Sequence, residues 1–344
     1  MKSTVNKIGL TYLLVLTATL PAHALSAPIS VMTFNVENLF DATHDAGKND
    51  ETYLPASEKT NTAHIEKCKK ISVRRWRDQC LYWDWSEAVV DQKLRVVSDA
   101  IKQVNGGQGP DIIALQEVEN LSILERLRND YLTGLGYQPA ALIEGKDTRG
   151  IDVAFLSKLP ITEAKLHPIT FPKSLKKRAG DTRPILEASF ELPNGKRLTG
   201  FSVHFPAPYH PTEMREVAYT KLNNIVAALP ENQAVFAAGD FNTTREEDTN
   251  KGMLERWVRP TWQVAHDLCD ACLGTSYYPP KDDWSFLDMV LWRETAGWKL
   301  TRSFLANQTS EQVLPNGTPK RFQLPEASGV SDHWPLVMVV EATD

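Results

Sequence analysis

The sequence predicts a mixed α/β domain, and three features of its hydrophobic pattern support this fold class. Short apolar runs with the length of buried strands recur along the chain. Between them lie segments whose apolar residues repeat with the period of a helix. No linker rich in Pro, Ser or Gly divides the chain, so one domain is the simplest organisation. The expected strands are residues 29–34, 111–115, 153–156, 200–203, 234–238, 286–292 and 336–340.

Local signals indicate where several of these elements begin and end. The first helix is expected to start at Asp84, which has Glu87 three residues later as in a capping box, and to stop at Gly106. The dipeptide Asn194-Gly195 predicts a tight hairpin, so that part of the sheet is antiparallel. Further helical stripes lie within residues 121–127 and 214–229.

The composition is that of an ordinary globular protein. The chain of 344 residues is 42% hydrophobic and 24% charged, and its 38 basic and 43 acidic side chains give a net charge of -5. These values exclude a disordered, collagen-like or disulfide-scaffold protein. They also argue against binding of nucleic acid through bulk positive charge, but they do not exclude a nucleic-acid enzyme with local basic groups.

The N-terminal segment, residues 1–24, has the pattern of a secretory signal peptide. Lys2 and Lys7 provide a positive start, the apolar run 8–20 follows, and a small-x-small site ends at Ala24. The apolar run is shorter than the ~20 residues that span a bilayer. We therefore expect cleavage near Ala24, a mature domain of residues 25–344, and a periplasmic or secreted protein without stable membrane association.

The four cysteines form two local pairs, Cys68 with Cys80 and Cys269 with Cys272. An oxidising compartment makes two short-loop disulfides the preferred interpretation, although four cysteines permit three pairings. A zinc site would need a second ligand pair at the right spacing, and a redox motif should open a helix after a strand. Leu273-Gly274 argues against that helix, so structural disulfides are favoured.

Polar residues follow or precede six of the expected strands, at the strand ends. One such residue is normally a turn or a cap, but six strand ends that carry Asp, Glu, Asn or His are harder to explain in that way. Loops at one rim of a rigid sheet commonly carry function. The residues in question are Asn35, Glu37, Asn38, Glu117, His204, Asp240, Asn242, Asp288, Asp332 and His333.

These residue types point to one kind of chemistry. Carboxylate and amide oxygens without thiolates are ligands for Mg²⁺, Mn²⁺ or Ca²⁺. Histidines paired with carboxylates supply a general acid and a general base near neutral pH. A hard cation together with such pairs meets the needs of phosphate-ester hydrolysis.

Four motifs resemble the signature blocks of the endonuclease/exonuclease/phosphatase superfamily, the DNase I-like enzymes. They are TFNVENLF at residues 33–40, LQEV at 115–118, GDFN at 239–242 and SDH at 331–333, in the order found in the family. The resemblance covers nearly all of the mature chain. It implies a four-layer α/β sandwich, two packed mixed β-sheets flanked by helices, with the site at one rim.

The resemblance also implies roles for individual residues. Glu117 would be the principal metal ligand, with Asn35 and Asp332 assisting and Mg²⁺ as the expected ion. His333 would be the general base or would polarise the phosphate, and Asp288 would orient it.

A second group of roles follows from the same resemblance. His204 would be the second imidazole, with Glu144 as its carboxylate partner. Asp240 and Asn242 would position the attacking water, bind phosphate or hold a second metal ion. The candidates for contact with phosphate are Arg183 and Arg149, each of which would otherwise be a surface ion-pair residue.

The expected function is an exported, metal-dependent nuclease that hydrolyses DNA or RNA by in-line attack of an activated water. Two local basic segments, residues 66–78 with Trp76 and residues 173–183, each carry a net charge of +4 and could contact phosphates. Each segment alone could equally be a solvated charged loop. The alternatives are a sphingomyelinase-type phospholipase C or another phosphatase of this fold, and a non-catalytic binding domain. Sequence leaves open endo or exo action, which His is the acid, the number of metals and the oligomeric state.

Overall fold

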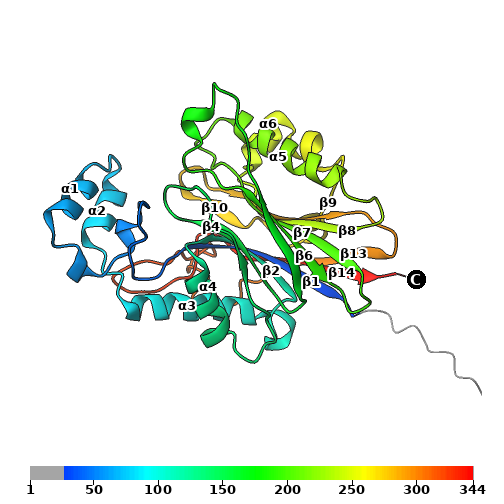
Figure 1. Cartoon of the computed structure of the whole chain (residues 1–344), viewed down its shortest axis with the longest axis horizontal. Coiled ribbons are helices and arrows are strands. Elements are labelled where there is room, and N and C mark those ends of the chain that lie inside the picture. The colour runs from blue at the N-terminus through cyan, green and yellow to red at the C-terminus, as the bar shows by residue number, and fades with distance from the viewer. Residues whose placement is uncertain (1–26, 344) are drawn as a thin grey trace, which may run out of the picture.

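Two six-stranded β-sheets pack face to face, and helices cover the outer face of each sheet (Figure 1). This computed structural model describes residues 27–343, so the expected signal peptide and its cleavage site lie outside the described residues. The strand orders are β13-β14-β1-β2-β4-β3 and β5-β6-β7-β8-β12-β9. The arrangement confirms the expected four-layer α/β sandwich.

The first sheet contains β1 (Ile29–Leu39), β2 (Ile112–Val118), β3 (Ala141–Leu142), β4 (Asp152–Ser157), β13 (Trp298–Leu305) and β14 (Leu336–Ala342). The second contains β5 (Ile161–His167), β6 (Ile185–Glu191), β7 (Arg197–His204), β8 (Ala234–Asp240), β9 (Gln263–Val264) and β12 (Asp288–Arg293). A separate ribbon consists of β10 (Ser276–Tyr278) and β11 (Asp283–Ser285). The α-helices are α1 (Thr62–Lys69), α2 (Arg74–Tyr82), α3 (Glu87–Lys102), α4 (Leu121–Arg126), α5 (Thr212–Ala227) and α6 (Arg245–Lys251).

The central strands are apolar on both faces because each of their faces packs against another layer. Successive residues of a strand point to opposite sides of the sheet. On β1, Val31 lies in the core between the sheets, whereas Met32 and Phe34 lie in the core beneath α3 and α4. On β8, Phe236 lies between the sheets and Val235 packs with α5. Continuous apolar runs, rather than alternating ones, are therefore what these positions require.

The sheet topology places several strand ends at one rim. Strands β1 and β2 are parallel, as are β7 and β8, so these pairs present their C-terminal ends together. Strand β12 runs antiparallel to β8 and begins at the same rim, where Asp288 lies opposite Asp240. The predicted hairpin at Asn194 joins β6 to β7 in antiparallel register, as expected.

Two predicted boundaries were wrong by a few residues. Helix α3 begins at Glu87 after Ser86, because the side chain of Asp84 instead accepts a hydrogen bond from the backbone of an earlier loop. Strand β12 begins at Asp288 rather than at Phe286, because Phe286 leaves the sheet and stacks on a histidine of the loop that follows β9.

The first basic segment is not a loop but a pair of short helices, α1 and α2, which project beyond the end of the sheets (Figure 1). Cys68 on α1 is bonded to Cys80 on α2, with Cα atoms 5.6 Å apart. Cys269 is bonded to Cys272, with Cα atoms 5.4 Å apart. The structure thus has both expected disulfides. Within residues 27–343, no helix has the length and apolar character needed to cross a bilayer.

Candidate active site

Three neighbouring strands bring three predicted residues side by side. His204 at the end of β7 lies opposite Asp240 at the end of β8, and Asp240 lies opposite Asp288 at the start of β12. All three side chains are buried. A Cβ at Gly239 would lie 2.0 Å from the carbonyl oxygen of Val203, so β7 and β8 approach this closely only because residue 239 is glycine.

The loop before β14 adds His333 to this group. Its Nδ1 lies 2.6 Å from Oδ2 of Asp288. The backbone N–H of His333 donates to Oγ of Ser331, and that hydroxyl donates to the carbonyl oxygen of Asn35 on β1. The imidazole is therefore fixed by contacts with both sheets, since β1 belongs to the first sheet and Asp288 to the second.

Asp240 lies at the centre of the polar group. Its Oδ2 accepts a hydrogen bond from Nδ2 of Asn35 at 3.1 Å and lies 3.4 Å from Nε2 of His204. Its Oδ1 accepts from the backbone N–H of Asn242 at 2.9 Å. Asp240, Asp288 and His333 also offer ligand atoms that lie within 4.8 Å of one another. The structure thus brings together side chains that the sequence could only list as candidates.

The two imidazoles have opposite protonation tendencies. Burial disfavours the imidazolium of His333, but the neighbouring carboxylates, first among them Asp288, raise the pKa of His333 well above its usual value. Burial and the positive charge of Arg183 both lower the pKa of His204 well below its usual value. Burial and the charge of Asp288 raise the pKa of Asp240 to about 7. The site therefore combines an imidazolium, a neutral imidazole and a carboxyl group that exchanges a proton near neutral pH.

The predicted metal ligands lie at the ends of β1 and β2 and in the loop before β14. Glu117 Oε2 accepts a hydrogen bond from the N–H of Asn38 at 3.1 Å, and Asp332 Oδ2 accepts one from Arg321 at 2.8 Å. The other carboxylate oxygen of Glu117 and of Asp332 accepts no hydrogen bond from residues 27–343. Carboxylate and amide oxygens are hard donors of the kind that a divalent cation prefers. Among the described residues, however, the ligand atoms that cluster within 4.8 Å of one another at this rim are those of Asp240, Asp288 and His333, and the amide oxygen of Asn35 accepts a hydrogen bond from the backbone N–H of Glu37.

Two cations beside these carboxylates were not anticipated, the buried Lys93 and the partly exposed Arg321. Arg321 Nε donates to Glu37 Oε1 at 2.6 Å, and Lys93 Nζ on α3 donates to the carbonyl of Val330 at 2.6 Å. Burial lowers the pKa of Lys93 to about 8, and burial together with Asp332 raises the pKa of Glu37 to about 7. Lys93 lies on the buried face of α3, and a charged residue within that apolar stripe is the feature of the sequence that marks it. Arg321 has no such signal.

Left-handed backbone conformations concentrate at this rim. Glu37, Asn38, Glu117 and Asn242 have φ angles of 48°, 62°, 63° and 54°. Non-glycine residues adopt this region at a cost of about 1–3 kcal/mol, and such strain clusters at functional sites. All four residues flank the candidate ligands and imidazoles, which supports a functional role for the rim.

The positive charges of both predicted arginines contribute to the lowered pKa of His204. Arg183 is buried, and its Nη1 lies 3.1 Å from Oδ2 of Asp147. Its Nε has no hydrogen-bond partner in the part of the chain that the structure describes. Arg149 is 42% exposed and lies 3.7 Å from Glu117 Oε2. Arg149 is thus the more accessible of the two to a phosphate.

The expected pairing of His204 with Glu144 is wrong. Glu144 is 52% exposed, and its Oε2 lies 3.7 Å from Lys48 Nζ. It follows β3 at the edge of the first sheet, whereas His204 belongs to the second sheet. The carboxylate beside His204 is Asp240, which the strand register places there.

Comparisons with known proteins agree with this architecture. A family model described as Endonuclease/Exonuclease/phosphatase family matches residues 85–333. Humanized TDP2 of D. rerio has a similar structure, with a TM-score of 0.54 and 13% identity over 92% of this chain and 99% of that one. A mannosyl-6-phosphatase of Bacteroides thetaiotaomicron has a TM-score of 0.54 and 15% identity, over 91% of this chain and 99% of that one.

A functionally unknown conserved protein of Enterococcus faecalis has a TM-score of 0.57 and 16% identity, over 92% of this chain and 100% of that one. No curated protein sequence matches the chain. Structural similarity at such low sequence identity shows only that the fold is shared. The family model, in contrast, matches well over half of the residues and therefore shows the family. The chain therefore belongs to the endonuclease/exonuclease/phosphatase family.

Proposed function

We propose that this protein is a divalent-metal-dependent phosphodiesterase that hydrolyses nucleic acid. The observation that carries the proposal is the rim at which Asp240, Asp288 and His333 converge beside His204. Next to it lie the oxygen donors of Glu117, Asn35 and Asp332. Phosphate-ester hydrolysis requires both parts, charge compensation for the phosphoryl oxygens and groups that move protons.

The protonation states suggest a division of labour among the side chains. His333, as an imidazolium fixed by Asp288, can donate a hydrogen bond to a phosphoryl oxygen or a proton to the leaving oxygen. Asp240, whose pKa burial raises to about 7, can accept the proton of the attacking water. Arg149 supplies a charged contact for the phosphate. A bound divalent cation, held by Glu117, Asn35 and Asp332, would offset negative charge on the phosphoryl group.

Local positive charge supports nucleic acid as the substrate. Lys176, Lys177 and Arg178 are exposed on the loop before β6, and the basic helices α1 and α2 project beyond the same rim (Figure 1). Such groups can bind backbone phosphates although the whole chain is acidic. One structure of similar fold, with a TM-score of 0.51, is that of D. rerio TDP2 complexed with a single-strand DNA product.

The test is an activity panel on the mature protein. Plasmid DNA, single-stranded DNA and RNA oligonucleotides, a chromogenic phosphodiester, a chromogenic phosphomonoester and sphingomyelin are each incubated with Mg²⁺, Mn²⁺, Ca²⁺ or EDTA. We expect nucleic-acid cleavage that EDTA abolishes and that Asp240→Asn and His333→Ala reduce by about 10²–10⁴-fold.

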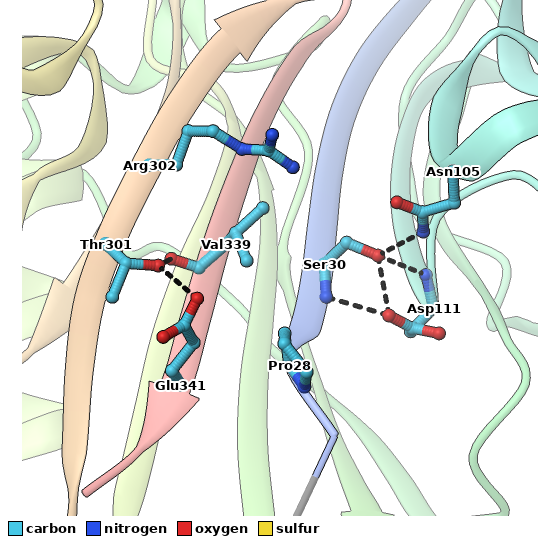
Figure 2. A pocket seen from close by; sticks show the side chains of 8 residues that line it. All are labelled: Pro28, Ser30, Asn105, Asp111, Thr301, Arg302, Val339 and Glu341. Atoms are coloured by element: carbon cyan, nitrogen blue, oxygen red, sulfur yellow. Dashed lines mark hydrogen bonds between the residues drawn. The ribbon is translucent and has the colours of Figure 1, made fainter.

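Asp111→Asn is a matched control at the opposite end of the sheets. There Asp111 accepts two hydrogen bonds from Ser30 at the start of β1 (Figure 2). The Asp111→Asn substitution should leave activity unchanged. Without nucleic-acid cleavage, turnover of sphingomyelin would instead indicate a sphingomyelinase-type phospholipase C. Turnover of a phosphomonoester would indicate a phosphatase of this fold. Inactivity on every substrate would favour a binding domain.

Export is a second part of the proposal. The pattern of residues 1–24 and the two disulfides support it, because disulfides persist in oxidising compartments. N-terminal sequencing of the protein from periplasm and medium should give a chain that starts at or near Leu25, after cleavage at Ala24. An uncleaved N-terminus in the cytoplasmic fraction would contradict it.

A further inference from the structure

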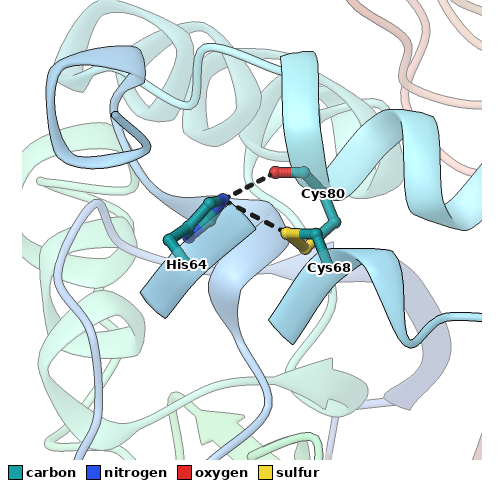
Figure 3. A group of neighbouring side chains, drawn as sticks. All are labelled: His64, Cys68 and Cys80. Atoms are coloured by element: carbon teal, nitrogen blue, oxygen red, sulfur yellow. Dashed lines mark hydrogen bonds between the residues drawn. A yellow bond between two sulfur atoms is a disulfide. The ribbon is translucent and has the colours of Figure 1, made fainter. Parts of the chain in front are cut away.

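A helical segment between β1 and α3 is one of the two strongly basic segments of the molecule. Residues 62–82 contain six basic and two acidic side chains, a net charge of +4 in a chain of net charge -5. The Cys68–Cys80 disulfide joins α1 to α2, and Nε2 of the buried His64 lies 3.0 Å from the carbonyl oxygen of Cys80 (Figure 3). The segment is thus internally cross-linked, which makes it a defined surface rather than a loose charged loop.

One face of α2 forms a wall of a groove. The groove has a volume of about 580 Å³, and its opposite wall is the segment that follows Phe322. Its lining combines guanidinium groups with aromatic rings. The lining residues are Arg74, Arg75, Asp78, Gln79, Tyr82, Trp83, Gln323 and Leu324.

The side chains in this groove are available to a ligand. Tyr82 is 76% exposed, so the face of its ring is open to a ligand. Arg74 is 3.5 Å from Asp78, whereas Arg75 makes no ion pair with any residue in the described part of the chain. An aromatic face beside an unpaired guanidinium is the combination that binds a base and its phosphate.

Each wall of the groove is connected to the active-site rim. On one wall, Leu324 follows Arg321 by three residues, so at most ~11 Å of extended chain separates their Cα atoms, and the side chain of Arg321 bonds Glu37 and Asp332. On the other wall, Trp83 stacks on Trp85 with ring centroids 6.4 Å apart. Trp85 in turn contacts the ring of Tyr53, at 5.1 Å between centroids. These contacts give the groove a fixed position relative to the rim.

We propose that this groove binds a nucleotide of a single-stranded nucleic acid on one side of the scissile phosphate. Tyr82 stacks on the base, and Arg75 pairs with a backbone phosphate. The inference rests on the proposed nuclease function and adds to it a preference for unpaired strands. A membrane surface is the competing occupant, because Val73, which precedes α2, and Trp76 on α2 are also exposed, but neither residue lines the groove.

Binding is measured separately from cleavage. Fluorescence anisotropy with a labelled single-stranded oligonucleotide is recorded on the Asp240→Asn protein, alone and combined with Tyr82→Ala, Tyr82→Phe or Arg75→Ala. Tyr82→Ala should weaken binding by about 5- to 150-fold, and Tyr82→Phe should retain it because the ring remains. Arg75→Ala should reduce the slope of log affinity against log salt by about 0.7. Arg302→Ala, on β13 at the opposite end of the sheets (Figure 2), is the matched control and should change neither.

Cleavage then tests whether the groove acts on the substrate of the active site. In the otherwise wild-type protein, Tyr82→Ala and Arg75→Ala should raise KM for the oligonucleotide and leave hydrolysis of a small chromogenic phosphodiester unchanged. Unaltered oligonucleotide affinity in Tyr82→Ala, or an unaltered slope of log affinity against log salt in Arg75→Ala, would refute nucleotide binding in the groove. Neither result would bear on the proposed nuclease function. The alternative is that this face binds a membrane. Binding to anionic vesicles that is abolished by Trp76→Ala but not by Tyr82→Ala would support that alternative and overturn the nucleotide-binding proposal. Absence of nucleic-acid cleavage in the wild-type protein would refute the proposed function itself.

Discussion

The contact between His333 and Asp288 makes a quantitative prediction for Asp288→Asn. The two groups are buried, and their nearest atoms are 2.6 Å apart. Unit charges at that distance attract by about 6 kcal/mol at an effective dielectric constant of ~20. Burial of each ion costs several kcal/mol and cancels much of this attraction. A charge-assisted hydrogen bond of this kind leaves a net contribution of about 2–3 kcal/mol to the free energy of unfolding.

The effect of Asp288→Asn should depend on pH in a defined direction. Asp288 raises the pKa of His333 above its value in the unfolded chain, which is about 6.5. Below about pH 6.5 the pair therefore makes its full contribution to the stability of the fold. That contribution is lost as pH rises through the raised pKa of the folded protein. We therefore expect Asp288→Asn to lower the free energy of unfolding by about 2–3 kcal/mol at about pH 6 and by clearly less at about pH 10.

Urea unfolding in EDTA measures this difference without interference from bound metal. The matched control is Asp283→Asn, because Asp283 forms a partly exposed ion pair with Arg245 at 3.6 Å. Its effect should stay below about 1 kcal/mol at both pH values. In the activity assay, Asp288→Asn should also lower kcat by about 10²–10⁴-fold. An equal loss of stability at both pH values, or unchanged kcat, would refute the assignment of His333 as an imidazolium held by Asp288.

Three further predictions concern protonation and packing. Histidine side-chain NMR in EDTA should show His333 still protonated at neutral pH and His204 still neutral well below its usual pKa; the reverse order would contradict the acid and base roles. Burial raises the pKa of Glu119 from 4.5, its value in an unfolded chain, to about 9. The folded protein therefore binds this proton more tightly than the unfolded chain does, and it should lose stability as the pH rises between these two values. Glu119→Gln should therefore raise the free energy of unfolding by about 3 kcal/mol at neutral pH and by little at about pH 4, as measured by urea unfolding. Finally, a Cβ at Gly200 would lie 2.3 Å from Cζ of Phe236 between the sheets, and Gly200→Ala should lower the free energy of unfolding by about 1–3 kcal/mol; a neutral thermal melt would show that this core is loose.

Much of the fold could be predicted because the strands are buried on both faces. Apolar runs such as the one that became β8 give a strong local signal, and Asn194-Gly195 specifies its own turn. The ends of helices and strands were predicted less accurately. The position at which α3 begins, for example, depends on whether the side chain of Asp84 caps the helix or accepts a hydrogen bond from an earlier loop. The helices α1 and α2 were missed because they are short and rich in polar and basic residues, without the long buried stripe that marks α3.

The candidate site divides in the same way. The sequence by itself determined that Asp, Glu, Asn and His occupy strand ends and that four motifs occur in the family's order, because these are local properties of the chain. Only the tertiary structure decided which of them meet. His204 faces Asp240 and not Glu144, and Arg321 reaches Glu37 from a distant loop, because strand register and sheet packing join residues far apart in sequence. Burial and charge in that packed rim also shift the pKa of the two imidazoles in opposite directions, upward for His333 and downward for His204.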